Sequence, residues 1–176
     1  RIMKKKQEFK IIFFGTPEFA KIILARLIET SNKPALVVTQ PDQPTGRKQI
    51  LTPPPVKSFI IKHEALNIKI LQPEKFDSGF GLQVAGFKPD LFILAAYGNI
   101  IPTKILEIPK YGTLNVHPSL LPRWRGPSPI QYAILNGDKK TGVAIILMDK
   151  EVDHGPILAA RELEISSITQ QAPSAD

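Results

Sequence analysis

Cysteine is absent from the 176 residues of this chain. Without cysteine the protein can form neither disulfides nor thiolate metal sites, and it has no thiol nucleophile. Any catalysis must therefore use oxygen and nitrogen side chains.

Long hydrophobic runs are also missing. No apolar run approaches the ~18 residues of a membrane-spanning helix, and the first ten residues are too short and polar for a signal or transit peptide. We expect a protein of the cytoplasm or of an organelle matrix, without a membrane partner and monomeric. A length of 176 residues with 43% hydrophobic residues allows one full core.

The fingerprints of common nucleotide-binding sites are not found either. A G-x-G-x-x-G motif beginning at Gly15 would need glycines where Pro17 and Ala20 stand. No Walker A sequence occurs in the chain. NAD, FAD and P-loop nucleotides therefore have little support as ligands.

Positive charge is concentrated in the first part of the chain. The formal net charge is +7, and residues 1–50 hold ten Lys or Arg against four Asp or Glu. Two interpretations stay open: a solvated N-terminal run at Lys4 to Lys6 that inflates the count, or a basic surface for a polyanion.

Strand and helix patterns alternate along residues 10–165. We predict strands at 10–14, 35–39, 69–71, 91–96, 112–116, 143–148 and 157–165, and helices at 17–28, 56–66, 77–87 and 129–135. Such alternation predicts an α/β fold with a doubly wound, mostly parallel sheet. Thr16 and Ser128 are expected to cap the first and last of these helices.

Three segments fall outside this alternation. Residues 40–55 contain five prolines and no hydrophobic period, which predicts a long surface loop. Residues 1–9 are expected to form an N-terminal extension. Residues 166–176 are polar and aperiodic, so we expect a disordered or artificial tail.

The run Leu114–Gly126 places an amide and an imidazole two positions apart, where a strand should meet a loop. Residues i and i+2 of a strand share a face, so Asn115 and His117 can point at one small volume. Pro118 and Pro122 cannot continue a ladder and should end the strand there. The pair is half of an acyl-transfer site, unless it is only a proline-rich strand exit with a satisfied histidine.

The stretch Asp149–Pro156 supplies carboxylates, one of which could fix the tautomer of His117. The residues alone do not choose between Asp149 and Asp153, and both could be solvated loop acids. His117, Asp153 and His154 could also form a two-histidine, one-carboxylate metal site. Because adjacent side chains point in different directions on most backbones, we expect no metal.

Longer motifs resemble the folate-dependent formyltransferases. The octapeptide N-V-H-P-S-L-L-P at 115–122 is similar to the signature of that family. R-W-R-G-P-S-P-I-Q at 123–131, G-T-P-E-F-A at 15–20 and T-Q-P-D at 39–42 are most similar to its members that formylate methionyl-tRNA. The resemblance implies a Rossmann-like formyltransferase fold, with the catalytic domain at 10–165. It also implies a C-terminal barrel domain that this chain lacks. We therefore expect a catalytic-domain fragment, and the resemblance does not decide whether that fragment is active by itself.

The resemblance further implies the roles of the polar residues. Asp153-His154-Gly155 matches the family's Asp-x-Gly, which makes Asp153 the third catalytic residue beside Asn115 and His117. The implied donor is 10-formyltetrahydrofolate. Asn115 would stabilise the tetrahedral oxyanion, His117 would accept or relay the proton of the attacking amine, and Asp153 would hold His117.

Binding residues are implied in the same way. The residues matching folate contacts are Leu94, Ala96, Tyr97, Gly98, Ile100, Ser119, Leu120, Leu121 and Pro122. Those matching tRNA contacts are Arg47, Lys48, Arg123, Trp124 and Arg125. Lys48-Gln49-Ile50 departs from the glycine and paired lysines common in the family. Leu120 and Leu121 could equally be core residues, and Trp124 could stack on the acceptor or pack inside.

The function implied is transfer of a formyl group to the methionine amino group of initiator methionyl-tRNA, for translation initiation. One alternative is a formyltransferase that acts on a nucleotide-sugar amine and has no need of a basic loop. Another is a non-catalytic folate- or RNA-binding domain.

Overall fold

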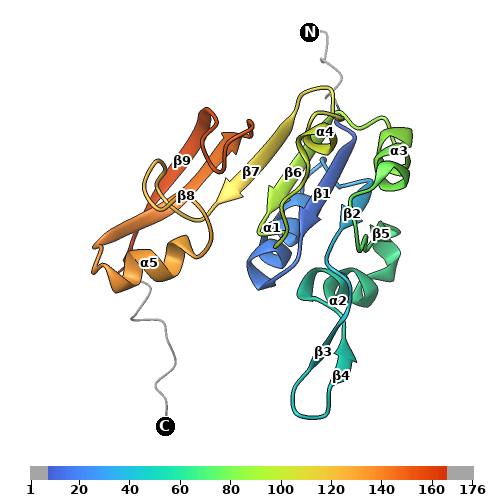
Figure 1. Cartoon of the computed structure of the whole chain (residues 1–176), viewed down its shortest axis with the longest axis horizontal. Coiled ribbons are helices and arrows are strands. Elements are labelled where there is room, and N and C mark those ends of the chain that lie inside the picture. Colours follow the sequence, from blue (N-terminus) through green and yellow to red (C-terminus); the bar gives the residue numbers. More distant parts are fainter. Residues whose placement is uncertain (1–7, 166–176) are drawn as a thin grey trace, which may run out of the picture. The chain divides into compact units, whose positions relative to one another are not determined.

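The computed structural model describes residues 8–165, and Figure 1 shows their course. The chain divides into two compact units, residues 1–113 and residues 114–176, and each is described by itself. The predictions on the Lys4 to Lys6 run, on the rest of the extension before Glu8 and on the tail 166–176 lie outside the described residues. The prediction of one catalytic domain over 10–165 stays a prediction.

The first unit is built on a parallel sheet. Its strands are β1 (Ile11–Gly15), β2 (Leu36–Val38), β5 (Lys69–Leu71) and β6 (Leu91–Ala95). They lie in the order β5-β2-β1-β6, and every neighbouring pair is parallel. After β1, the chain adds β2 and then β5 on one side of β1, and it then adds β6 on the other side. This arrangement confirms the predicted α/β fold with a mostly parallel, Rossmann-like sheet.

Helices alternate with these strands. Their bounds are α1 (Glu18–Ile28), α2 (Pro55–Lys62), the 3₁₀ helix η1 (Glu64–Leu66), α3 (Ser78–Gly86) and α4 (Thr103–Leu106). Helix α3 forms despite three glycines because Phe80 and Val84 pack into the core and Asp77 caps its first turn. The sequence did not predict α4, because one turn is too short to show a hydrophobic period.

Neither predicted side-chain cap bond forms, although Ser128 does occupy the N-cap position of the helix that begins at Pro129. Helix α1 has Pro17 at its N-cap position without a side-chain cap bond. The Thr16 hydroxyl instead donates to the Tyr97 carbonyl at 2.7 Å, which joins the ends of β1 and β6. Ser128 precedes its helix with φ +67° and makes no cap bond either. The Thr16 hydroxyl thus bonds to a carbonyl that follows β6, and not to the first turn of α1.

The predicted loop at 40–55 contains a β-hairpin, which corrects that prediction. Strands β3 (Gln43–Thr45) and β4 (Ile50–Thr52) are antiparallel, and their threonine hydroxyls meet at 2.6 Å. The turn uses positive φ at Gly46 and Gln49. Every residue of both strands is exposed, so no hydrophobic alternation marks the hairpin in the sequence. Figure 1 shows it projecting from α2 and the end of β2.

The second unit is antiparallel. It contains β7 (Thr113–His117), which begins at the last residue of the first unit, then α5 (Pro129–Leu135), β8 (Lys140–Leu147) and β9 (Ile157–Glu164). Strand β8 lies antiparallel to both β7 and β9. The β8–β9 connection carries no helix, so the chain returns beside itself. Within residues 8–165, no helix is long and apolar enough to cross a membrane.

Candidate active site

Strand β7 presents its polar side chains on one face, as the two-residue period predicts. Asn115 is 6% exposed and His117 is 5% exposed, while Leu114 and Val116 between them are only half-buried. Burial of a neutral amide and an imidazole requires hydrogen-bond partners. The second unit supplies them from two loops.

Asp153 is the first of these partners. Its Oδ1 accepts a hydrogen bond from Asn115 Nδ2 at 2.8 Å, and its Oδ2 lies 3.5 Å from His117 Nδ1. Oδ2 also accepts the backbone N–H of Gly126 at 2.9 Å. The carboxylate therefore lies between Asn115 and His117, with its side chain only 10% exposed.

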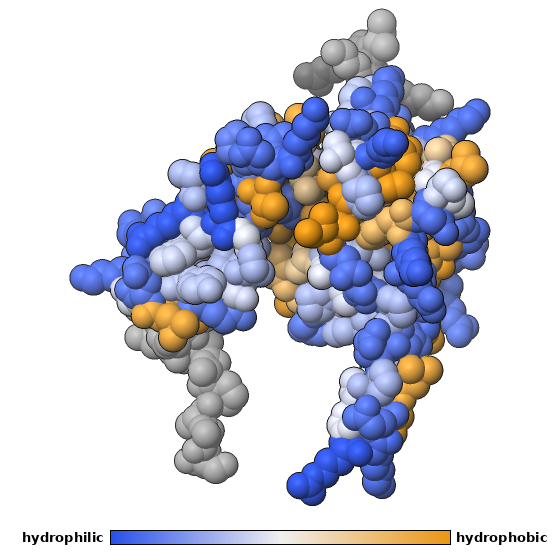
Figure 2. Space-filling view, in the orientation of Figure 1, coloured by the Kyte–Doolittle hydropathy of each residue, from blue (hydrophilic) through white to orange (hydrophobic). Residues whose placement is uncertain are grey.

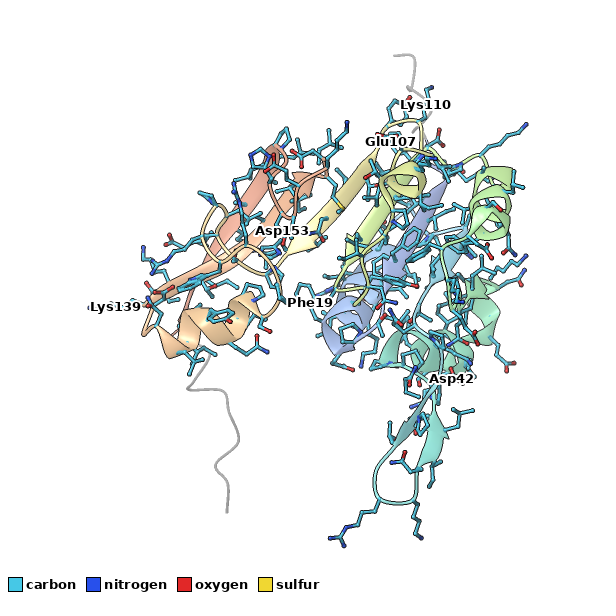
Figure 3. The ribbon with its side chains drawn as sticks, in the orientation of Figure 1. Phe19, Asp42, Glu107, Lys110, Lys139 and Asp153 are labelled. Atoms are coloured by element: carbon cyan, nitrogen blue, oxygen red, sulfur yellow. The ribbon has the colours of Figure 1, made fainter. Side chains whose placement is uncertain are left out.

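Asp153 reaches the site on a loop that follows an antiparallel strand. Because β8 is antiparallel, its last residue Leu147 pairs with Leu114, near the start of β7. The loop after β8 must therefore fold back along β7, and Asp153 adopts φ +48° in that loop. Figure 3 shows Asp153 beside β7 and β8.

Asp149, the other candidate carboxylate, takes a different partner. Its Oδ2 accepts from His154 Nδ1 at 2.8 Å, and its Oδ1 accepts from the Glu151 backbone N–H. The hydrogen bonds from His154 and Glu151 lower the pKa of Asp149. His154 thus faces Asp149 while Asp153 faces the site. Among residues 8–165, no three His, Asp or Glu side chains gather as metal ligands would.

The second ring nitrogen of His117 is also occupied. His117 Nε2 lies 2.8 Å from the Trp124 carbonyl oxygen. A carbonyl can only accept, so Nε2 carries a hydrogen in this contact. Nδ1, the other ring nitrogen, faces the Asp153 carboxylate. Both ring nitrogens of His117 therefore lie against acceptor oxygens.

The turn after β7 is fixed by internal contacts. The Ser119 hydroxyl is fully buried and donates to the Arg123 carbonyl at 2.6 Å. Leu120 is half-buried over Gly142 of β8, where an added β-carbon would lie 2.5 Å from Leu120 Cδ2. Leu121 is half-buried and Pro122 is exposed. Of the folate residues predicted in this turn, Ser119 therefore already uses its hydroxyl within the loop.

Asp138 is a site residue that the sequence did not reveal. It accepts from Arg123 Nη2 at 2.8 Å and from Trp124 Nε1 at 2.7 Å. Hydrogen bonds from Asn136 and Trp124, and the charge of Arg123, lower the pKa of Asp138. In the sequence, Asn136 and the following glycine indicated only the end of a helix, and an acid after such a turn is usually solvated.

The Trp124 ring is half-buried and makes its contacts within the second unit. It stacks on Tyr132 of α5, with ring centroids 5.8 Å apart and planes 9° from parallel. Arg125 is exposed. The indole therefore contacts Tyr132 and Asp138 without being part of the core, and its contact with the acceptor stays a prediction.

The segment after β6 carries the other predicted folate residues. Tyr97 is 2% exposed and its ring contacts Phe14 and Phe76 in the core, where burial raises its pKa to about 12. Leu94 is half-buried against the same core. The exposed members of the segment are Ala96, Gly98 and Ile100, and the first two have φ of +44° and +100°.

The basic residues Arg47 and Lys48 stand exposed at the turn of the hairpin. Figure 2 shows hydrophilic side chains over this end of the hairpin. Its base is tied to α2, where Lys57 Nζ contacts both Asp42 carboxylate oxygens at 2.8 Å, and Figure 3 labels Asp42 there. Hydrogen bonds from Gln72 and Lys57 lower the pKa of Asp42. The hairpin thus carries two free-standing cations on an anchored base.

Comparisons with known proteins bear on this arrangement. Residues 9–173 match the family described as formyl transferase. The chain is 51% identical over 150 residues to methionyl-tRNA formyltransferase of Halalkalibacterium halodurans, covering 85% of this chain and 46% of that protein. It is 47% identical over 157 residues to methionyl-tRNA formyltransferase of Bacillus subtilis, covering 89% and 49%. The chain therefore spans about half the length of these curated relatives.

Solved structures show the same fold. Phosphoribosylglycinamide formyltransferase from Bacillus halodurans aligns with a TM-score of 0.69 at 23% identity, covering 92% of this chain and 86% of that one. A formyltetrahydrofolate deformylase from Pseudomonas syringae aligns with a TM-score of 0.68 at 19% identity, covering 94% and 56%. At such identities the likeness establishes the fold alone.

Proposed function

The chain belongs to the formyl transferase family, and on that premise we propose that its protein formylates the methionine of initiator methionyl-tRNA. The proposed donor is 10-formyltetrahydrofolate. The observation that carries the proposal is the buried contact of Asn115, His117 and Asp153. The name shared by the relatives of about 50% identity supports the choice of acceptor.

Formyl transfer to an amine requires stabilisation of a negatively charged oxygen. When the amine nitrogen bonds to the formyl carbon, the formyl oxygen becomes a tetrahedral oxyanion. Asn115 Nδ2 has two hydrogens, and its bond to Asp153 uses one of them. The second hydrogen can be donated to the oxyanion, an effect of about 10²- to 10³-fold in kcat for one such donor.

The reaction also moves one proton. The attacking neutral amine must lose a proton once its nitrogen has bonded to the formyl carbon, and the folate nitrogen gains one as its bond to that carbon breaks. His117 Nδ1 and Asp153 Oδ2, 3.5 Å apart, can hold that proton between these two events. General acid–base assistance of this kind contributes about 10²- to 10⁴-fold.

Candidate contacts for the donor occur in each unit. In the first unit, the exposed backbone after β6 lies where the strand order reverses beside β1, the usual ligand position of such sheets. Ala96, Gly98 and Ile100 are the candidates there, with Leu94 and Tyr97 supporting the segment from the core. In the second unit, Leu120, Leu121 and Pro122 are candidates, with Ser119 fixing the turn.

The acceptor is assigned to basic groups. Arg47 and Lys48 on the hairpin, and Arg125 with Arg123 two positions before it, are proposed to contact tRNA phosphates. Trp124 is proposed to act from within the second unit, given its contacts with Tyr132 and Asp138. A monomer located in the cytoplasm or an organelle matrix completes the proposal.

A panel of acceptors tests the proposal. The protein at its full natural length is incubated with 10-formyltetrahydrofolate and, separately, with methionyl-tRNA, glycinamide ribonucleotide and an aminosugar nucleotide. We expect formylation of methionyl-tRNA alone. Formylation of only a small-molecule amine would refute the acceptor, and formylation of none would favour a non-catalytic binding domain.

A further inference from the structure

The backbone of residues 123–126 makes a bond to each of three polar side chains of the site. The Arg123 carbonyl accepts from Ser119, the Trp124 carbonyl accepts from His117 Nε2, and the Gly126 N–H donates to Asp153. These contacts are 2.6, 2.8 and 2.9 Å long. A shift of this backbone would therefore move both His117 and Asp153.

The backbone of this segment is not in a relaxed conformation. Trp124 has φ +59°, in the left-handed region that side chains with a β-carbon avoid, and Gly126 has φ +83°. A residue held in such a conformation needs contacts elsewhere that favour it. The backbone bonds to Ser119, His117 and Asp153 are some of these contacts, and the side chains of the segment add others.

Asp138 supplies the side-chain contacts. This residue follows α5, and its carboxylate binds Arg123 Nη2 with one oxygen and Trp124 Nε1 with the other. Its side chain is 7% exposed, and Asn136 Nδ2 adds a further bond at 2.7 Å. The guanidinium of Arg123 also lies 5.2 Å from the Trp124 ring. One buried carboxylate thus binds the side chains of two consecutive residues, and the backbone carbonyls of the same two residues accept hydrogen bonds from Ser119 and His117.

We propose that Asp138 is a positioning residue that orients His117 through the indole and carbonyl of Trp124. It touches neither His117 nor Asp153, and it acts by fixing the left-handed backbone of Trp124, whose carbonyl binds His117. The inference rests on the proposed function where activity is concerned, but the hydrogen bond at His117 Nε2 can be observed without any turnover.

The test compares Asp138→Asn with Trp124→Phe. The first removes the charge and one acceptor, and the second removes the Nε1 donor while keeping a ring to stack on Tyr132. Glu162→Gln is the matched control, because it makes the same carboxylate-to-amide change in an exposed pair with Lys140 in the same unit. If Asp138→Asn does not fold, Trp124→Phe carries the test.

The structural readout is NMR of the ¹⁵N-labelled protein, whose three histidines give few imidazole signals. We expect the His117 Nε2–H to exchange slowly in the parent and in Glu162→Gln, and its signal to be lost in both other variants. The kinetic readout is formyl transfer, where kcat should fall about ten- to a hundred-fold with KM values within about twofold. Asp138→Glu should recover part of kcat.

Two results would overturn the inference. One is a protected His117 signal in both Asp138→Asn and Trp124→Phe, whatever happens to activity. The other is a raised KM with kcat unchanged, which would mark Asp138 as part of a binding surface. If the parent transfers no formyl group to any acceptor, the proposed function fails, and the NMR comparison still decides on Asp138.

Discussion

Replacing Asp153 with asparagine is the most informative change to the candidate site. The carboxylate accepts one bond from Asn115 and one from the Gly126 N–H, at 2.8 and 2.9 Å. Asparagine keeps the shape but turns one acceptor into a donor. With the Asn115 amide in its present orientation, one of the two N–H groups then faces another N–H in a nearly buried position.

The size of the effect follows from these two bonds. A hydrogen bond to a charged group contributes about 1.5–3 kcal/mol, and a neutral one contributes about 1 kcal/mol. Asp153→Asn loses one bond to a charge and weakens the other. We therefore expect the free energy of unfolding to fall by about 2–4 kcal/mol. Asn115→Asp combined with Asp153→Asn reverses donor and acceptor, so both bonds can form again and stability should return to within about 1 kcal/mol of the parent.

Urea unfolding followed by tryptophan fluorescence measures this effect, because the only tryptophan, Trp124, lies in the second unit. Formyl transfer should stay lost in the double variant, since position 115 then offers no N–H to an oxyanion. A loss of less than about 0.5 kcal/mol in Asp153→Asn would refute the account of these bonds. So would a double variant no more stable than the single one.

Three further predictions concern other parts of the chain. Gly15→Ala should lower the free energy of unfolding by about 1–3 kcal/mol, because an added β-carbon would lie 2.6 Å from the β-carbon of Ala20 in helix α1. Unchanged stability in urea unfolding would contradict this close packing. The double variant Arg47→Ala, Lys48→Ala should bind tRNA more weakly. The slope of the logarithm of the binding constant against that of the salt concentration should become less steep by about two phosphate contacts. An unchanged slope would show that the hairpin does not contact tRNA phosphates. Hydrogen bonds from Asn136 and Trp124 lower the pKa of Asp138. Its ionised form therefore stabilises the fold at pH values above the ordinary carboxyl pKa. This stabilisation is lost as the pH falls below about 4. An acid titration of fluorescence in which Asp138→Asn matches the parent would contradict that sign.

The face of β7 could be predicted from the sequence because a strand has a fixed period of two. Thr113, Asn115 and His117 share the buried side for that reason alone. The choice of Asp153 over Asp149 could not be made from the residues, since both lie in one loop. It came from the resemblance, and the structure brings Asp153 to the site by folding the loop back along β7.

Contacts made by the backbone escaped prediction for a different reason. The Trp124 carbonyl and the Gly126 N–H are common to every residue type, so nothing in the sequence marks them as partners of His117 and Asp153. Thr16 illustrates the same limit, because its cap was displaced by a carbonyl 81 positions away. Asp138 remained hidden because its partners, Arg123 and Trp124, are paired with it only in the folded chain.

The hairpin at 43–52 and the antiparallel return of β9 show what hydrophobic patterns miss. Both hairpin strands are exposed on all sides, whereas β9 was predicted as a strand and only its antiparallel pairing with β8 was not. A strand without a buried face has no alternation to detect. The parallel strands of the first unit were predicted well because β1 and β2 are buried throughout.

Single-turnover formyl transfer by Asn115→Ala and His117→Ala tests the central claim most directly. The protein at its full natural length is mixed in excess with 10-formyltetrahydrofolate and methionyl-tRNA, and formylmethionine is counted over time. The account predicts a fall of about 10²-fold or more in each variant, with a double variant little slower than the worse single one. A rate within about threefold of the parent in either variant would contradict formyl transfer by these residues.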